Sequence, residues 1–260
     1  MSKAGMDDDD RPFVTALARG LEILGCFSAS RPEIGGTQLA ALTGLPQPTV
    51  WRLCHTMVQL GFLVSVNGDK LRPGIPVLKL GRAALASIPL AAAAQAPMQM
   101  LADRFSAASG LGARDGNRMV FVQRCISEAT LVMNLRVGAR LPILSSAVGW
   151  GYLAGLEPAE REALLAEYGS PDPRWPAIQP LFDAAMAEAA QDTFILNIGV
   201  FHPGYNGVAV PLRGPDGRVA FGLTCAGSAA THSAEFLRRE VAPLLLQTAR
   251  DLEQLCGQTS

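Results

Sequence analysis

Residues 36–53, GTQLAALTGLPQPTVWRL, decide the fold of the N-terminal part of the chain. The pattern of residues 37–43 predicts a short amphipathic helix, and Gly44 follows it where a left-handed residue commonly ends a helix. Pro48 suits the first turn of a second helix, because the N–H that proline lacks has no partner there. Apolar residues then recur at helical spacing over residues 50–60. The stretch therefore predicts a helix-turn-helix.

The flanking residues extend this motif on both sides. Apolar residues at helical spacing predict a preceding helix over residues 13–27. Residues 62–66 and 70–72 read as two short strands around a turn at Asn67 and Gly68. The order of helix, helix, turn, helix and hairpin is that of a winged helix-turn-helix, whose second motif helix enters the DNA major groove.

The polar face of the second motif helix and the hairpin supply the candidate DNA contacts. Arg52 could bind guanine O6 and N7, while Gln47 and Gln59 could bind adenine or phosphate. Trp51 either remains exposed to DNA or packs under the hairpin. Each polar residue could equally be a solvated group of an ordinary amphipathic helix. The candidate DNA-binding residues are Gln47, Thr49, Trp51, Arg52, His55, Thr56, Lys70 and Arg72.

Composition and charge restrict the class of protein. The 260 residues are 49% hydrophobic and 17% charged, which predicts a packed core, and the formal net charge is −1. Residues 1–10 hold one Lys and four Asp, a net charge of −3, and we expect them to form a disordered acidic tail. Residues 11–75 hold six Lys or Arg and three acids, a net charge of +3. Any nucleic-acid surface is therefore expected in this N-terminal unit.

Targeting and redox signals point to the cytoplasm. No apolar run reaches the roughly 18 residues of a membrane helix, and the N-terminus lacks the basic and then apolar order of a signal peptide. We therefore expect no membrane partner. The five cysteines lie far apart without a C-x-x-C motif, which predicts buried thiols rather than disulfides or a zinc site.

The remainder of the chain alternates between helical and strand patterns. We expect an acidic tail over residues 1–10, a DNA-binding domain over 11–74, a linker helix over 75–88 and a second domain over 89–260. An alanine-rich helix is predicted to run from Pro89 to Ser109. Predicted strands cover residues 111–115, 119–125, 129–137, 194–197, 207–212 and 218–226. Predicted helices cover residues 145–155, 158–168 and 176–192, and a last helix follows Ser233. The second domain is therefore predicted to be α+β with a mainly antiparallel sheet.

Enzymatic motifs are missing from the sequence. The three histidines lie too far apart for a zinc-binding H-E-x-x-H motif, and neither a nucleophile elbow nor a phosphate-binding loop occurs. The glycines of residues 149–155 miss the dinucleotide-binding spacing and are better explained by close helix packing. We therefore expect no catalytic residues, no metal and no cofactor.

Several stretches together resemble one protein family. Residues 36–53, with GFL at 61–63 and LRPG at 71–74, resemble the DNA-binding half of the IclR family of bacterial transcription regulators. The second half resembles that family's effector-binding domain, which is similar to a GAF domain. Its matching stretches are residues 137–142, 147–149, 207–212 and 216–219. The resemblance runs from about Arg11 to the C-terminus with the elements in the same order.

The resemblance implies a homodimer or a dimer of dimers that binds double-stranded operator DNA and responds to a small organic acid. Open N–H groups at the start of the helix near Ser145, with Asn197 and Thr224, could donate to a carboxylate without a buried cation. The implied effector-binding residues are Met133, Ser145, Ser146, Ala147, Val148, Asn197, Gly207, Thr224 and Ala226.

This sequence departs from the family at five positions. Members often have Asp at Asn197, Cys at Gly207, Ser at Ala226, His at Leu144 and Lys at Trp150. We expect these changes to give a roomier and more apolar pocket that favours an aromatic or hydrophobic acid. Trp150 could instead lie at a subunit interface.

One alternative from another class of protein remains open. Arg52 and His55 are the basic residues of the second motif helix, which is a low basic content. The chain could therefore be a dimeric small-molecule-binding or scaffold protein whose helix-turn-helix no longer contacts DNA. The sequence leaves open the effector, the operator, and whether the protein represses or activates.

Overall fold

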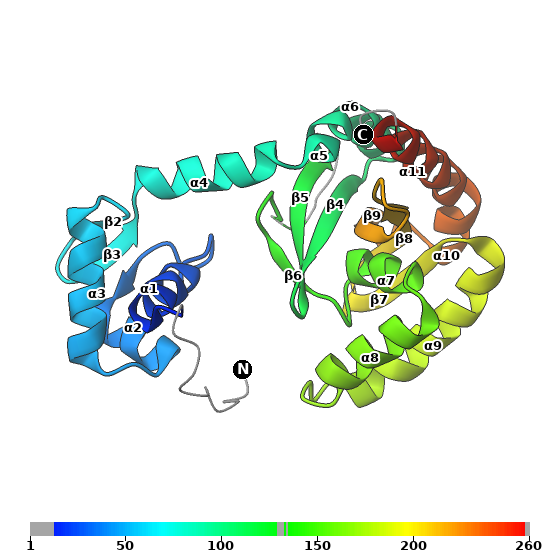
Figure 1. The fold of residues 1–260 in the computed structure, drawn as a ribbon. Coiled ribbons are helices and arrows are strands. Elements are labelled where there is room, and N and C mark those ends of the chain that lie inside the picture. Colours follow the sequence, from blue (N-terminus) through cyan, green and yellow to red (C-terminus); the bar gives the residue numbers. More distant parts are fainter. Residues whose placement is uncertain (1–12, 129–132, 134, 258–260) are drawn as a thin grey trace. The chain divides into compact units, whose positions relative to one another are not determined.

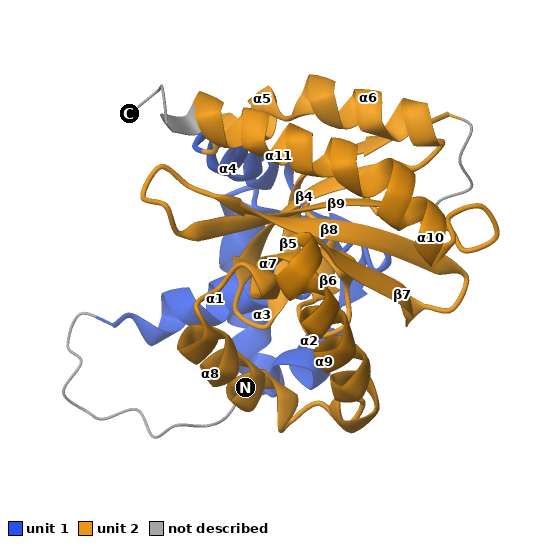
Figure 2. Cartoon of the chain, turned by 90° about the vertical axis from the view of Figure 1, so that its right-hand side faces the viewer, with its two compact units in different colours: residues 1–87 blue, residues 88–260 orange. Residues whose placement is uncertain are grey.

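The computed structural model describes residues 13–128, 133 and 135–257. The chain divides into two compact units, Met1–Ser87 and Ile88–Ser260, shown in different colours in Figure 2. None of the helices in the described ranges is long and apolar enough to cross a membrane.

Unit 1 is a winged helix-turn-helix (Figure 1). Its helices are α1 (Thr15–Gly25), α2 (Gly36–Thr43), α3 (Gln47–Gln59) and α4 (Ile75–Ala86). Its strands are β1 (Ile34–Gly35), β2 (Leu63–Val66) and β3 (Lys70–Pro73), in the sheet order β1-β3-β2. The predicted helix-turn-helix and hairpin are confirmed, and β1 is an addition that the sequence pattern did not reveal.

Local chemistry explains the turn between α2 and α3. Gly44 has a φ of 68°, and its N–H donates to Ala40 O at 2.9 Å, so the left-handed glycine ends α2 as expected. Pro48 lies in the first turn of α3. The small core is filled from nearly every element of the unit. Its least exposed side chains are Ile23, Ile34, Leu39, Val50 and Leu63.

The connection into unit 2 differs from the prediction. Two helices, α5 (Pro89–Ala93) and α6 (Gln95–Phe105), replace the single alanine-rich helix predicted to reach Ser109. Ser106 adopts a left-handed conformation with a φ of 47° and ends α6, and strand β4 begins two residues later at Ala108. The prediction was wrong because no glycine or proline marks this helix end.

Unit 2 is built on a six-stranded antiparallel sheet in the order β6-β5-β4-β9-β8-β7. The strands are β4 (Ala108–Asp115), β5 (Arg118–Ile126), β6 (Arg140–Pro142), β7 (Ile195–His202), β8 (Tyr205–Arg213) and β9 (Val219–Ser228). The predicted α+β class and antiparallel sheet are confirmed. The predicted strand over residues 129–137 lies partly outside the described residues. Met133 and residues 135–137 are described and are not in a strand, and the next described strand is β6.

Helices cover both faces of this sheet (Figure 2). One face is covered by α5, α6 and α11 (Ala242–Gly257), where α10 (Ala234–Phe236) and a π-helical turn at Leu237–Val241 lead into α11. The other face is covered by α7 (Ala147–Ala154), α8 (Pro158–Gly169) and α9 (Trp175–Asp192). Each face has its own apolar core, so the sheet is the middle layer of three.

Helix α7 lies unusually close to the sheet because glycines form the surface beneath it. A Cβ atom at Gly222 would lie 2.2 Å from Val148 O, and one at Gly112 would lie 2.7 Å from Val148 Cγ2. A Cβ atom at Gly151 would lie 2.7 Å from the Cβ of Ala209. The backbone of α7 therefore packs against strands β4, β8 and β9 through small residues.

Trp150 belongs to the core of unit 2. Its side chain is 1% exposed, its Nε1 donates to Leu144 O at 2.7 Å, and its ring meets Phe182 edge to face at 5.3 Å. A subunit-interface position for Trp150 is therefore wrong, because the side chain is already covered within its own domain. Of the cysteines whose side chains are described, Cys54, Cys125 and Cys225 are buried as expected, whereas Cys26 is only partly covered.

Candidate functional site

Helix α3 is anchored by one face and presents the other to solvent. Val50, Cys54 and Met57 are buried in the core of unit 1. Five of the predicted DNA contacts on this helix are exposed: Gln47, Trp51, Arg52, His55 and Thr56. Thr49 is partly covered. On β3, Lys70 and Arg72 are exposed on either side of buried Leu71. All eight predicted DNA-binding side chains therefore remain at least partly accessible.

Trp51 is the most prominent apolar group of this surface. Its side chain is 67% exposed, and its ring stacks on that of His55 with 5.3 Å between centroids and 15° between planes. The ring is not packed under the hairpin. A large aromatic ring that remains exposed to water is unfavourable unless a partner covers it, so the stack marks a contact surface.

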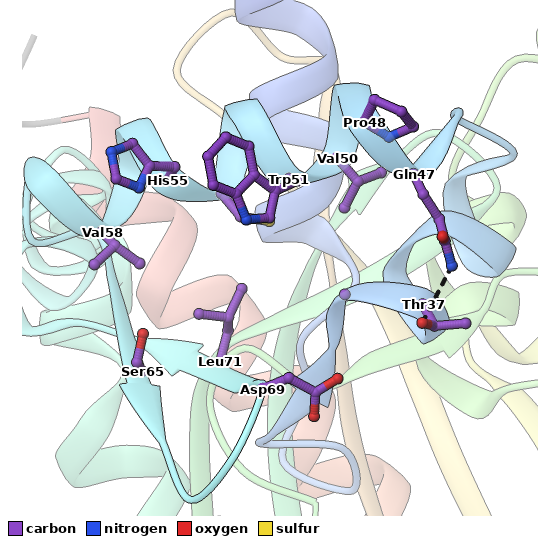
Figure 3. Close-up of a pocket in the computed structure, with 12 residues that line it drawn as sticks. Thr37, Gln47, Pro48, Val50, Trp51, His55, Val58, Ser65, Asp69 and Leu71 are labelled. Atoms are coloured by element: carbon purple, nitrogen blue, oxygen red, sulfur yellow. Dashed lines mark hydrogen bonds between the residues drawn. The ribbon is translucent and has the colours of Figure 1, made fainter.

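A cleft of about 560 Å³ separates α3 from the sheet of unit 1 (Figure 3). Gln47, Trp51 and His55 line its α3 side, and Ser65 and Asp69 line the opposite side. Gln47 Nε2 donates to Thr37 Oγ1 at 3.2 Å, which ties the start of α3 to α2. These three predicted residues therefore share one side of the helix.

The other predicted residues of α3 lie along α1. Thr49, Arg52 and Thr56 border a groove that also includes Leu17 and Leu21. The hydroxyl of Thr56 donates its hydrogen to Arg52 O at 3.0 Å. It can therefore accept a hydrogen bond from DNA but not donate one. The structure therefore divides the predicted set into a side with Trp51 and a side with Arg52. Together the sides offer an indole N–H, an imidazole, an amide and a guanidinium, the groups that contact base edges and phosphates.

Unit 2 contains a cavity of about 30 Å³ at the N-terminus of α7. Its lining residues are Phe121, Arg124, Leu135, Leu141, Ser146, Ala147, Val148, Asn197, Phe201, Tyr205, Gly207, Thr224 and Ala226. Seven of the nine predicted effector-binding residues are among them, and Met133 and Ser145 are not. The structure therefore brings together most of the predicted site.

The polar side chains of this cavity already serve the scaffold. Asn197 Nδ2 donates to Ser145 O at 3.1 Å, and Asn197 Oδ1 accepts from Phe201 N at 3.3 Å. Thr224 Oγ1 donates to Val208 O at 3.0 Å, which leaves this hydroxyl no proton for a ligand. The role of Ser145 is to supply its carbonyl oxygen to Asn197. The expectation that Asn197 and Thr224 are free donors is therefore only partly met.

The start of α7 has open donors of its own. Ser146 caps the helix, because its Oγ accepts from Gly149 N at 3.2 Å and donates to Pro142 O at 2.6 Å. The N–H groups of Ala147 and Val148 lie in the first turn, where a helix provides no acceptor. These amides and the helix dipole favour an anion at this end of the cavity.

The expected roomy pocket is wrong for the described residues. A Cβ atom at Gly207 would lie 3.0 Å from Ala226 Cβ and 3.1 Å from Ala147 Cβ. The small residues therefore allow close approach of α7 and do not leave empty space. A volume of about 30 Å³ accommodates little more than one water molecule.

The sequence also missed a cation, Arg124, in this cavity. Its guanidinium carbon lies 4.8 Å from the ring centroid of Phe121. Burial lowers the pKa of Arg124, an effect partly offset by neighbouring Tyr205, and burial raises the pKa of Tyr205. The Tyr205 hydroxyl donates to Ala226 O at 3.1 Å. The expectation of a carboxylate site without a buried cation is therefore wrong.

Comparison with known proteins identifies both units. Residues 16–66 match the IclR helix-turn-helix domain, and residues 82–254 match the IclR C-terminal domain of bacterial transcriptional regulators. The chain belongs to the IclR family. Members of this family are DNA-binding transcription regulators and not enzymes. The second match covers the cavity at α7, so the effector-binding domain of this IclR protein contains it.

Individual relatives agree with this assignment. The HTH-type transcriptional regulator TsaQ1/TsaQ2 of Comamonas testosteroni is 30% identical over 247 residues, which cover 92% of this chain and 87% of the relative. The crystal structure of an IclR family regulator from Brucella abortus is 34% identical, with a TM-score of 0.85 over 97% of this chain and 96% of the other. An IclR homologue from Microbacterium hydrocarbonoxydans, solved with 4-hydroxybenzoate, shares the fold at 24% identity and a TM-score of 0.76, over 95% of this chain and all of the other.

Metal binding has no support in the described ranges. Among these residues, no group of three or more His, Cys, Asp or Glu side chains could hold a metal ion. The cavity of unit 2 and the exposed face of α3 are therefore the two candidate sites of this protein.

Proposed function

We propose that this IclR protein is a one-component regulator that binds operator DNA through α3 and the hairpin and senses a small organic acid in the cavity of unit 2. The observation that carries the second part is the cavity at the N-terminus of α7, where the N–H groups of Ala147 and Val148 favour an anion. A regulator of this kind works on DNA in the cytoplasm as a homodimer or a dimer of dimers.

The acid we propose has an aromatic or otherwise apolar body. Phe121, Leu135, Leu141 and Phe201 supply apolar walls, and the polar side chains of the lining are Arg124, Ser146, Asn197, Tyr205 and Thr224. An apolar wall with a few convergent polar groups is typical of sites for small organic ligands. Because the cavity is small, an aromatic acid must displace part of its lining. The 4-hydroxybenzoate of the Microbacterium homologue supplies the first probe.

The charge of unit 1 is sufficient for DNA binding. Residues 11–75 carry six Lys or Arg and three acids, a formal charge of +3, so these segments of two chains together carry +6. This charge allows several contacts with DNA phosphates. Each such contact makes the DNA affinity fall more steeply as the salt concentration rises. The near balance of charge in the remainder of the chain argues that DNA binding is confined to unit 1.

Fluorescence anisotropy tests both parts of the proposal. The protein is titrated onto a labelled fragment of its own upstream DNA and onto a scrambled duplex across a salt series, with and without 4-hydroxybenzoate. We expect tighter binding to the upstream fragment, a steep loss with salt and a change in affinity on adding the acid. A coupling of about 1–3 kcal/mol between the acid and DNA is typical of such regulators.

Arg52→Ala provides the matched variant for this assay. We expect it to lose about 1–3 kcal/mol of specific DNA affinity, whereas Arg31→Ala, another exposed arginine of unit 1, retains wild-type affinity. Equal weak binding of both duplexes at every salt concentration would contradict operator binding by α3. It would instead favour the scaffold or small-molecule-binding alternative.

A further inference from the structure

A β-bulge places Arg124 in the cavity of unit 2. Strand β5 pairs with β4 so that Phe121 faces Gly112 and Arg124 faces Gly110, with a register shift between these two pairs. Gly110 and Gly112 are two residues apart and lie on the same face of the sheet. Their partners Phe121 and Arg124 therefore also share a face, although they are three residues apart. This face is the one that α7 covers, since Gly112 lies against Val148.

The space for the guanidinium comes from a glycine. A Cβ atom at Gly110 would lie 3.0 Å from Arg124 Nη1 and 2.4 Å from Phe121 Cε1. Any larger residue at this position would displace both side chains. The backbone at Gly110 thus allows the Arg124 guanidinium to lie over the Phe121 ring, beside Tyr205.

The charge of Arg124 has no anionic counterpart in the described part of the chain. None of the described residues that line the cavity is acidic, and Arg124 forms no ion pair with any described residue. Its Nε atom is buried without a hydrogen-bond partner. A buried charge is unfavourable unless it is paired and hydrogen-bonded, and the Phe121 face and the neutral Tyr205 hydroxyl compensate only part of that cost. Among the described residues that line the cavity, Arg124 is therefore a cation without an acidic partner.

We propose that Arg124 is the anchor for the carboxylate of the effector, and that the bound carboxylate lies between its guanidinium and the first-turn amides of α7. This inference rests on the proposed acid-sensing function and names the residue that would provide its selectivity. The guanidinium offers a planar fork that matches a carboxylate, and the α7 amides supply further donors. One cation in a small apolar cavity suits a monocarboxylate better than a phosphate, which carries more charge. Phe121 and Tyr205 would then contact the apolar body of the acid.

Isothermal titration separates recognition of the charge from recognition of the ring. Benzoate and 4-hydroxybenzoate are compared with 4-hydroxybenzamide, which has the same ring but no negative charge, and with pyruvate as a small acid. We expect the wild-type protein to bind at least one of the acids and to bind the amide at least tenfold more weakly than 4-hydroxybenzoate. Arg124→Gln is expected to weaken acid binding by at least about tenfold, as loss of a charged hydrogen-bond partner does.

Arg104→Gln is the matched control. Arg104 also stands over an aromatic ring, with 5.7 Å from its guanidinium carbon to the Phe105 centroid, but on the exposed side of α6. This variant removes the same charge from the same unit outside the cavity, and we expect it to bind the acids as the wild type does. Arg124→Lys retains the charge without the fork and should bind the acids with an affinity between those of Arg124→Gln and the wild type.

Thermal denaturation distinguishes a ligand anchor from a structural arginine. Without ligand, Arg124→Met should unfold at the same temperature as the wild type or higher, because it removes an unpaired buried charge. It should lose the rise in Tm that the acids give the wild type.

Each contrary outcome has a separate meaning. Acid binding by Arg124→Gln at wild-type affinity, or equal binding of 4-hydroxybenzoate and its amide by the wild type, would overturn the role of Arg124 and leave acid sensing intact. A wild-type protein that binds none of the four probes would overturn the acid-sensing proposal and this inference together. A large fall in the Tm of both Arg124→Met and Arg124→Lys without ligand would assign Arg124 a structural role.

Discussion

Asn197→Ala tests whether the side-chain amide near the start of β7 holds α7 in place. Asn197 is 2% exposed, and it connects Ser145 O, at the approach to α7, with Phe201 N in the irregular part of β7. Alanine removes both hydrogen bonds and leaves the strand otherwise intact. Because Ser145 is 3% exposed, water cannot readily replace the lost donor to its carbonyl.

The two hydrogen bonds set the size of the effect. An orphaned buried carbonyl costs about 1–3 kcal/mol, which applies to Ser145 O. Phe201 is only partly buried, so water can satisfy much of its N–H, and this bond adds up to about 1 kcal/mol. We therefore expect unit 2 to lose about 1–4 kcal/mol of unfolding free energy. For a unit of this size such a loss lowers Tm by about 2–16 °C.

Calorimetry of the full chain measures this change in the transition assigned to unit 2. Gln179→Ala, which removes an exposed amide from α9, is the control and should shift stability by less than about 0.5 kcal/mol. The reasoning fails if Asn197→Ala also stays within about 0.5 kcal/mol of the wild type. In that case the Asn197 amide would not support α7 and would be available to a ligand, as the sequence suggested.

Two further predictions concern the sheet of unit 2. Gly110→Ala should lower the free energy of unfolding by about 1–3 kcal/mol and weaken acid binding, because its Cβ would lie 2.4 Å from Phe121 Cε1. Gly204→Ala is the control and should be tolerated, because its Cβ would lie 3.5 Å from the nearest atom. Equal denaturation curves of the two variants would contradict this prediction. Burial lowers the pKa of His232 below its usual 6.5, so its stabilising effect is present above pH 6.5 and is lost as the pH falls through the lowered folded-state value. Tm should therefore fall more steeply from pH 7 to pH 5 in the wild type than in His232→Gln, and parallel Tm profiles would refute the argument.

Local signals explain why the DNA-binding unit was predictable. Gly44 and Pro48 mark the turn through backbone properties that act within a few residues, and the apolar period of α3 extends over three turns. Strand β1 could not be predicted, because Ile34–Gly35 is too short to show any period and pairs with β3 only through the tertiary fold. The sequence also did not predict the end of α6 at Ser106. The left-handed conformation of this residue depends on the path of the chain into β4, which is again a property of the tertiary fold.

For the cavity of unit 2, only the family resemblance predicted which residues lie there. That resemblance selected residues near the cavity, but it did not show what their side chains do. Asn197 and Thr224 are hydrogen-bonded to main-chain atoms of segments far away in the sequence, and Trp150 is covered by Phe182 of α9. Such partners cannot be seen from the order of residues, because they depend on which segments the fold brings together.

Arg124 shows this limit most clearly. Strict alternation along β5 would place residues 121 and 124 on opposite faces of the sheet, and the bulge reverses that relation. The expected gain of room at Gly207 and Ala226 failed for a similar reason, since the backbone of α7 approaches until the small side chains touch. Both errors came from treating side chains as independent of the backbone that carries them. In the proposed acid site, selectivity therefore depends less on the departures from the family at Asn197, Gly207 and Ala226 than on a bulge and a glycine that position one cation.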